Sequence, residues 1–493
     1  MFNLYKPFRN RLRQYSITDS LKTVFHFLQW LDFDVTLPHQ LAGPPMWNPK
    51  SRMRAGLVQW EFEILAREIV MNGDKYGKRV LSSWNDVSRE INAIKAIENE
   101  CWKGREDGDV LYELVRIAHR QFPWQRGMNR PHIARYARLY EHAGLDEMVR
   151  AEYGMSHAEM LQLSVSLSGH FLDRWSMNLP VRNELNTVPP DVCDAFVRKF
   201  SLSLPELRDE YLKNASYGIN WAYSFNPLRS KPLIRLSDNL AICPIPMFLL
   251  RRATTEMYFD LVKDQVGFAK NFGPAVQELV GEIASRSNQS GRFTIIPETR
   301  YGSANAPKDT VDWIIEDETA TLFVECKGAR ARYQGISDLT DRRFIDGEFE
   351  RVRAFTLQLY KTLNDALQGK YPNWKPRNAP IYPLIVTLED WQTFGIQVDK
   401  VVIAPLKPEL TAIGIDPGIV ERHPPSFCAA ETFEMTAGVC DAVGLERVFG
   451  AKTRGEEAHW ALETFLMNYF RDEISSLTGS VFADQWQRLL RRV

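Results

Sequence analysis

The sequence predicts a multidomain protein, in which an α-helical N-terminal module is followed by an α/β domain whose central mixed β-sheet is flanked by helices. The first observation is length, because 493 residues suffice for about two to four domains. The second is the helical spacing of apolar residues through much of the first 215 positions. The third is a change after about residue 220, where short β-rich segments begin to alternate with helical ones.

Composition and charge exclude several classes of protein. Hydrophobic residues make up 44% of the chain and charged residues 25%, as in ordinary soluble globular proteins. With 61 basic and 62 acidic side chains the net charge is −1, so any site for a polyanion must be local. The longest nearly apolar run, Ala241 to Leu250, is shorter than the ~18 residues of a membrane span. Six cysteines without a CxxC pair suit a reducing compartment, so we expect a cytoplasmic protein that does not enter membranes.

The helical module is predicted over residues 1–215. Apolar residues from Val58 to Ile69 recur at helical spacing, and Ser156 with Glu159 forms a capping box before another such run. Ser203 opens a further helix in the same way. We interpret this module as one for target recognition or oligomerisation. Residues 216–260 follow as a β-hairpin connector, with strands expected at Lys231–Leu236 and Leu240–Ile245.

The α/β domain is predicted over residues 261–410 from the order of its elements. Its expected helices are Pro274–Arg286 and Glu348–Leu367, and its expected strands are Phe293–Pro297, Thr310–Glu316, Thr321–Cys326, Ile381–Leu388 and Val401–Ala404. Residues 411–493 return to helical periodicity, so we expect a C-terminal extension that packs on the α/β domain.

The residues that indicate chemistry lie between Thr310 and Arg332, where two β-rich runs flank an acidic turn and predict a hairpin. Side chains alternate faces along a strand, so Glu325 and Lys327 should point the same way, with Asp312 of the partner strand reaching the same face. The triplet Glu325-Cys326-Lys327 is the only acid-x-Lys triplet in the chain. Two carboxylates and an ammonium at one strand end suit Mg²⁺-dependent hydrolysis of a phosphodiester.

These residues resemble the motif of the PD-(D/E)XK, or restriction-endonuclease-like, nuclease superfamily, over roughly residues 265 to 410. The resemblance implies a restriction-endonuclease-like fold for the α/β domain. It also implies that Asp312, Glu325 and the backbone carbonyl of Cys326 hold Mg²⁺, for which Mn²⁺ can substitute. Lys327 would then orient the attacking water and stabilise the charge of the transition state.

The same resemblance implies a further glutamate on the helix before the sheet. That helix offers Glu278 and, one turn later, Glu282, although Gln277 also falls near the expected position. A QxxxY signature occurs in some members after the lysine. Here Gln358 is present, and Thr362 stands where the tyrosine would be.

A second stretch indicates contact with nucleic acid. Residues 116–140 hold six arginines and no acid, with aromatic residues interleaved, so Arg126, Arg130 and Trp124 are candidates to contact phosphates and stack on bases. The alternative is a solvated helix face whose aromatic residues belong to the core. Arg330 and Arg332, just past the lysine, are placed to guide a backbone into the site.

The sequence therefore predicts a Mg²⁺-dependent nuclease, with DNA preferred over RNA as substrate and endonuclease action expected. By analogy with fused nucleases of prokaryotic anti-phage defence, it would act as a homo-oligomer or with a partner defence protein. Two alternatives stay open. One is a catalytically silent nucleic-acid-binding or scaffold protein, in which Asp312, Glu325 and Lys327 are merely strand-end charges; the other is a DNA repair or transposition nuclease.

Overall fold

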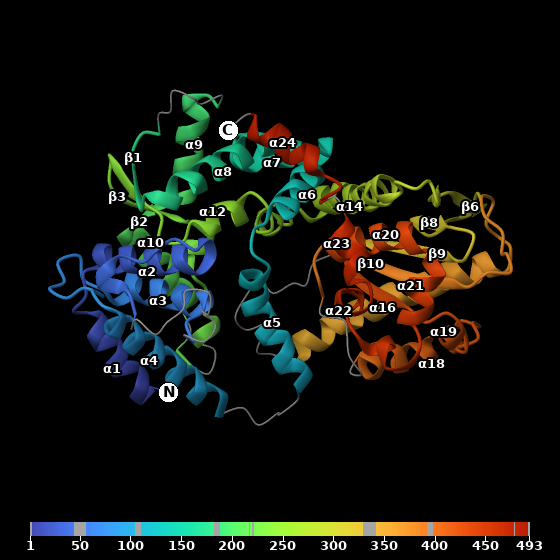
Figure 1. The fold of residues 1–493 in the computed structure, drawn as a ribbon, viewed down its shortest axis with the longest axis horizontal. Coiled ribbons are helices and arrows are strands. Elements are labelled where there is room, and N and C mark those ends of the chain that lie inside the picture. Colours follow the sequence, from blue (N-terminus) through green and yellow to red (C-terminus); the bar gives the residue numbers. More distant parts are fainter. Residues whose placement is uncertain are drawn as a thin grey trace.

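The computed structural model describes residues 2–43, 56–103, 110–181, 188–215, 217–218, 221–328, 342–391, 398–477 and 479–491. Figure 1 shows an elongated molecule with a mainly helical half on the left and an α/β domain on the right. In this described part of the chain, no helix combines the length and the apolar composition needed to cross a membrane.

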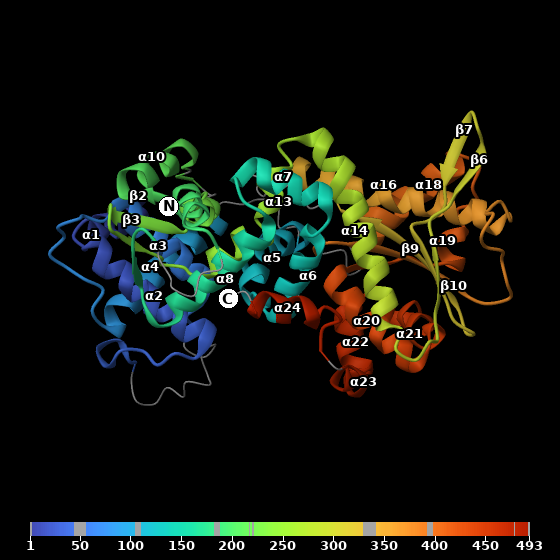
Figure 2. The ribbon, with the colours of Figure 1, turned by 90° about the horizontal axis from the view of Figure 1, so that it is seen from above.

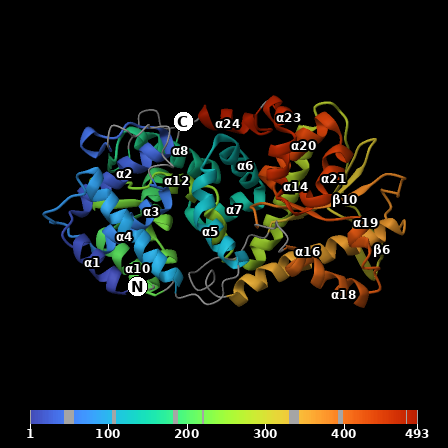
Figure 3. The same cartoon turned by 60° about the horizontal axis from the view of Figure 1, so that its bottom comes forward.

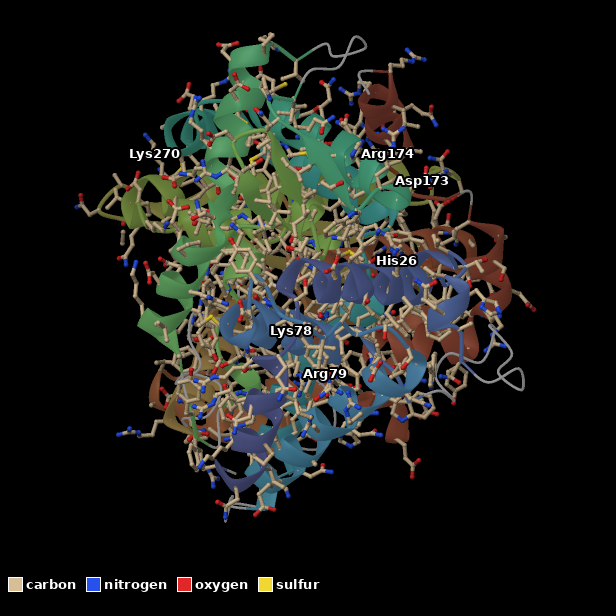
Figure 4. The ribbon with its side chains drawn as sticks, turned by 90° about the vertical axis from the view of Figure 1, so that its left-hand side faces the viewer. His26, Lys78, Arg79, Asp173, Arg174 and Lys270 are labelled. Carbon is tan, nitrogen blue, oxygen red and sulfur yellow. The ribbon has the colours of Figure 1, made fainter. Side chains whose placement is uncertain are left out.

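The first lobe of the helical half is a bundle of amphipathic helices around one hydrophobic core. Ser16 caps its second helix by accepting from the Asp19 N–H, and Ser203 forms a capping box with Glu206. The loop that holds Lys78 and Arg79, both labelled in Figure 4, is pinned to the turn after the first helix by a bridge between Tyr15 and Arg79. The helices are α1 (Phe2–Leu12), α2 (Ile17–Phe33), α3 (Gln59–Asn72), α4 (Trp84–Lys103) and α10 (Leu204–Asn214).

A second group of helices continues the helical half toward the α/β domain and shares a hydrophobic core with it. The predicted capping box of Ser156 and Glu159 begins α8. These helices are α6 (Arg130–Tyr140), α7 (Ala143–Tyr153), α8 (His157–Asp173), α9 (Pro190–Phe200), α12 (Met247–Arg252) and α13 (Met257–Leu261). Helix α5 (Val110–Arg126) contacts α3 instead, and its Trp124 belongs to the core of the first lobe. Because one core runs through both halves, the α/β domain is firmly attached to this group.

The hairpin expected between the halves belongs to a small sheet. Its strands β3 (Leu233–Ser237) and β4 (Leu240–Ile242) pair antiparallel, and β1 (Ser176–Asn178) and β2 (Ser201–Ser203) flank them in the order β1-β4-β3-β2. The hairpin is therefore built into the helical half, because its neighbours on both sides come from the helical module.

The α/β domain is centred on a mixed sheet with the order β11-β10-β9-β8-β5 among the described strands. Neighbours β5, β8 and β9 are antiparallel, whereas β9, β10 and β11 run parallel. Helices α14 and α20 pack on one face of the sheet and α16 with α18 on the other, as Figures 2 and 3 show. The bounds are α14 (Gln265–Ser287), β5 (Thr294–Pro297), β8 (Trp313–Glu316), β9 (Thr321–Lys327), α16 (Arg342–Leu367), β10 (Ile381–Thr387), α18 (Ala404–Ala412), β11 (Ser426–Ala429) and α20 (Ala430–Val443).

Three parts of this domain differ from the expectation. Residues Asp399–Ile403, where a strand was expected, form a π-helical turn, η4, that runs into α18. An additional hairpin, β6 (Arg300–Ser303) and β7 (Ala306–Asp309), projects between β5 and β8 (Figure 2). The segment after residue 411 supplies β11 to the central sheet, and its last helix, α24 (Ala483–Leu490), returns to pack on α6 (Figure 1).

Candidate active site

Asp312 and Glu325 come together because β8 and β9 form an antiparallel pair. Trp313 lies opposite Val324, so the residue before Trp313 and the residue after Val324 are also neighbours. Alternation along β9 places Val324 and Cys326 in the core beneath α14, and Phe323 in the core beneath α16. Glu325 and Lys327 lie two and four residues after Phe323, so their side chains are on the same face of the sheet, the one covered by α16.

Hydrogen bonds fix the geometry of this cluster. The Cys326 N–H donates to Oδ2 of Asp312 at 2.5 Å, and Lys327 Nζ donates to Oε1 of Glu325 at 2.7 Å. A second bond, of 3.1 Å, joins Lys327 Nζ to Oε1 of Gln358 on α16. The Lys327 ammonium also lies 5.4 Å from the centre of the Phe355 ring, a distance typical of a cation–π contact. The lysine is thus held between β9 and α16.

The two carboxylates carry more negative charge than their surroundings neutralise. Burial, and then the charge of Glu325, raise the pKa of Asp312 from its ordinary value to about 7. Burial likewise raises the pKa of Glu325, whose residue is only 3% exposed, and Lys327 offsets this only in part. Such a pair is stabilised by any further cation that binds beside it.

The backbone around Asp312 is held on three sides. The buried Tyr371 hydroxyl accepts the N–H of Val311 at 3.0 Å, and the backbone oxygen of Asp312 accepts the N–H of Glu298 at 2.9 Å. The Trp313 indole donates to the Gln277 carbonyl at 2.9 Å. A Cβ on Gly281 would lie 2.1 Å from the Trp313 ring, so a glycine is needed there for α14 to approach β8.

Glu298 is a further acidic residue beside the site that the sequence analysis missed. It follows β5, whose Pro297 pairs with Trp313, so it lies beside Asp312 at the same sheet end. Its charge contributes to raising the pKa of both Asp312 and Glu325. The signal was available in the sequence, because Glu298 directly follows the predicted strand Phe293–Pro297. Recognising it also required the knowledge that β5 pairs with β8.

The glutamates predicted on α14 lie elsewhere. Glu282 forms ion pairs with Arg138 and Arg286. The Glu278 side chain is 56% exposed, and its carboxylate lies 4.0 Å from Nε2 of His142. Both face α6 and α7, so neither joins Asp312 in this structure, and that prediction is corrected. The α14 side chain that reaches toward the site is Gln277, whose amide donates to the Glu298 carboxylate at 3.1 Å.

The basic and aromatic stretch forms internal contacts that join the two halves. Trp124 is only 3% exposed and its indole donates to Glu63 at 2.9 Å, so this ring belongs to the core and cannot stack on a base. Arg135 pairs with Glu434 of the α/β domain at 2.9 Å. Arg130 is exposed, with its guanidinium 5.8 Å from the Trp486 ring centre. Trp124 is therefore a core residue, as the alternative interpretation of this stretch expects. Arg135 and Arg130 contact an acid and an aromatic ring of the protein itself.

Other predicted residues have no described surroundings. Arg330 and Arg332 lie outside the described residues, as does the Arg126 side chain. The Cys326 thiol is buried on the α14 face, as the alternation of β9 predicts, whereas the role of its carbonyl stays a prediction.

The donor set suits Mg²⁺ in kind and number. Within the described residues no three His, Cys, Asp or Glu side chains are grouped closely enough to hold a metal ion together. Mg²⁺, however, is commonly held by one or two carboxylates, with water and substrate phosphate completing its coordination. Asp312 and Glu325 provide two such carboxylates. The chain matches no known protein-family model, no curated protein and no solved structure.

Proposed function

We propose that this protein is a metal-dependent nuclease that hydrolyses phosphodiester bonds, a Mg²⁺-dependent DNA endonuclease whose α/β domain has a restriction-endonuclease-like fold. The observation that carries the proposal is the cluster of Asp312, Glu325 and Lys327 at one end of β8 and β9. A buried and a half-buried acid side by side, both with raised pKa values, are unfavourable for a purely structural cluster and favourable for binding a divalent cation.

The arrangement of elements also supports the proposal. A helix, three antiparallel strands, a second helix and a parallel strand occur in the order α14, β5, β8, β9, α16 and β10, with the β6–β7 hairpin inserted between β5 and β8. This order is compatible with the fold that the sequence resemblance implies. On the same resemblance we propose a cytoplasmic role in prokaryotic anti-phage defence, as a homo-oligomer or with a partner defence protein.

Each residue has a separate role in the proposed reaction. Asp312, Glu325 and the Cys326 carbonyl would hold Mg²⁺, which supplies Lewis acidity and a bound water of lowered pKa. Lys327 Nζ, positioned by Gln358 and Phe355, would hydrogen-bond the attacking water and stabilise the charge that develops on the phosphate oxygens. Glu298 and Tyr371 would act on the reaction only by positioning Asp312.

The test is single-turnover cleavage of supercoiled plasmid in Mg²⁺, with EDTA as the metal-free control. We expect Asp312→Asn and Glu325→Gln to abolish cleavage and Lys327→Ala to slow it by about 10²-fold or more. DNA affinity, measured in Ca²⁺, should change by less than about tenfold for Lys327→Ala, because the ammonium acts mainly in the transition state.

Lys213→Ala is the matched control, since Lys213 lies on the helical half and its side chain is 67% exposed. It should cleave at the wild-type rate. Wild type that binds DNA but cleaves neither DNA nor single-stranded RNA, even when a partner protein is supplied, would favour the scaffold protein over the nuclease. Cleavage that survives both carboxylate substitutions would overturn the site assignment.

A further inference from the structure

A separate pocket opens beside the edge strand of the central sheet. It has a volume of about 340 Å³, within the usual range for small-molecule sites, and lies between β11, the π-helical turn η4 with α18, and the short helix η5 (Gly455–His459). Figure 1 shows α18 and α19 (Ile419–Arg422) together at the lower right of the α/β domain. Asp312, Glu325 and Lys327 do not line it.

Most of the charged and ionisable side chains that line the pocket already have a partner there. Nδ1 of His459 lies 3.0 Å from a carboxylate oxygen of Asp399, and Lys407 pairs with Glu421. The exception is Lys452, which is only 5% exposed. Its ammonium donates to the carbonyl of Ala458 at 3.0 Å and forms no ion pair with any described residue.

A lysine ammonium has three hydrogens to donate, so a single carbonyl partner leaves a buried positive charge poorly compensated. Burial lowers the pKa of Lys452 to about 8, and the nearby charge of Glu457 offsets this only in part. A purely structural lysine at this position would be expected to carry a carboxylate partner or to reach solvent.

A second polar group in the same pocket also lacks a partner. Ser426, the first residue of β11, is 3% exposed, and its hydroxyl has no hydrogen-bond partner among the described residues. A buried hydroxyl without a partner costs free energy that a bound acceptor would recover. The remaining wall is largely apolar and includes Phe427 and Trp460.

We propose that this pocket binds a small organic anion, with its phosphate or carboxylate group against Lys452 and Ser426 and a planar, apolar body against Phe427 and Trp460. The ammonium supplies charge and the hydroxyl a directional donor. The apolar walls exclude water, which strengthens both interactions. The site is independent of the proposed nuclease chemistry, since it needs neither metal nor nucleic acid.

Isothermal titration calorimetry in EDTA, without nucleic acid, tests the proposal with two matched pairs of probes. Adenosine 5′-monophosphate is compared with adenosine, and benzoate with benzamide, so that each anion has a neutral counterpart and phosphate is distinguished from carboxylate. We expect at least one anion to bind with a Kd below about 1 mM and about tenfold or more tightly than its counterpart. No binding of either anion at about 10 mM, or equal binding of the neutral probe, would overturn the proposal.

Variants connect the binding to the named residues. Lys452→Met should weaken binding of the anion by about tenfold or more, and Ser426→Ala by about threefold. Lys407→Met is the control, because that ammonium is already paired with Glu421, and it should bind within about twofold of wild type. If Lys452→Met fails to fold, the affinities of Lys452→Arg and Ser426→Ala for the anion are measured in its place. Binding unaffected by both of these would refute the site.

Discussion

Glu63 in the helical half is a buried acid and Asp312 in the α/β domain is a half-buried one, and their surroundings have opposite effects on their pKa values. Burial alone would raise the pKa of Glu63, but Arg229, 2.5 Å away, together with Arg251 and the Trp124 indole, lowers it to about 2. Asp312 has a neighbouring carboxylate where Glu63 has arginines, and its pKa rises to about 7. The surroundings of Glu63 neutralise its buried charge, whereas those of Asp312 do not.

The difference distinguishes a buried charge that serves the structure from one that serves a function. A buried acid that is paired and hydrogen-bonded contributes little net stability to a fold, but removing its partner lowers the stability strongly. A buried acid held beside another acid costs stability in the free protein, and it is retained at sites where a ligand supplies the missing charge. The Glu63 site and the Asp312 site should therefore respond in opposite directions when one charge is removed.

The largest expected effect is in the helical half. Arg229→Met leaves the Glu63 carboxylate buried without its main cation, so the free energy of unfolding should fall by about 3–5 kcal/mol. Urea unfolding followed by circular dichroism at pH 7 measures this. Arg422→Met is the control, because Arg422 and Asp416 form a pair with 56% and 66% exposed side chains. Its effect should stay within about 0.5 kcal/mol. A similar loss in both variants would contradict the comparison.

At the sheet end, removing a charge should stabilise the protein. The pKa of Asp312 is about 7 in the folded state, against an ordinary 3.8, so between these pH values the folded state binds more protons than the unfolded state. The free energy of unfolding therefore falls as pH rises across this window. Asp312→Asn removes that loss, so at pH 8 in EDTA the variant should exceed wild type by on the order of 2–3 kcal/mol.

The same variant has a built-in control. Near pH 4 the Asp312 carboxyl is protonated in the folded protein, so Asp312→Asn and wild type should be of similar stability there. Added Mg²⁺ should stabilise wild type and not Asp312→Asn, because ligand binding to the native state raises its stability. An Asn variant less stable than wild type at both pH values would show that Asp312 is a structural acid like Glu63.

The sequence predicted the side chains at the sheet end better than those on the flanking helix α14, for a physical reason. Strand alternation has a period of two, so the common face of Glu325 and Lys327 follows from their spacing, and the hairpin adds Asp312. The rotation of a helix about its axis depends on its neighbours. Glu278 and Glu282 on α14 were therefore placed on the wrong side, because the fit of Gly281 against Trp313 turns them away.

Two further differences have the same origin in tertiary contacts. The aromatic spacing around Trp124 cannot distinguish a core ring from an exposed one, and only its bond to Glu63 shows which it is. The apolar run at Val401 reads as a strand by composition, but the structure packs it as a π-helical turn against α16. A short apolar run is compatible with either a helix or a strand until the elements packed against it are known.

The smallest expected effect comes from changing how Asp312 is positioned while leaving its charge in place. Tyr371→Phe removes the hydroxyl that accepts the Val311 N–H and should cost about 1 kcal/mol of stability. Tyr360→Phe is matched to it, since Tyr360 is equally buried but its hydroxyl donates to the His423 carbonyl, away from Asp312. Both variants should lose similar stability. Only Tyr371→Phe should also slow single-turnover cleavage, by about threefold to tenfold, because Val311 sets the backbone of Asp312. Equal cleavage rates for the two variants would show that Tyr371 stabilises the fold without positioning the acid.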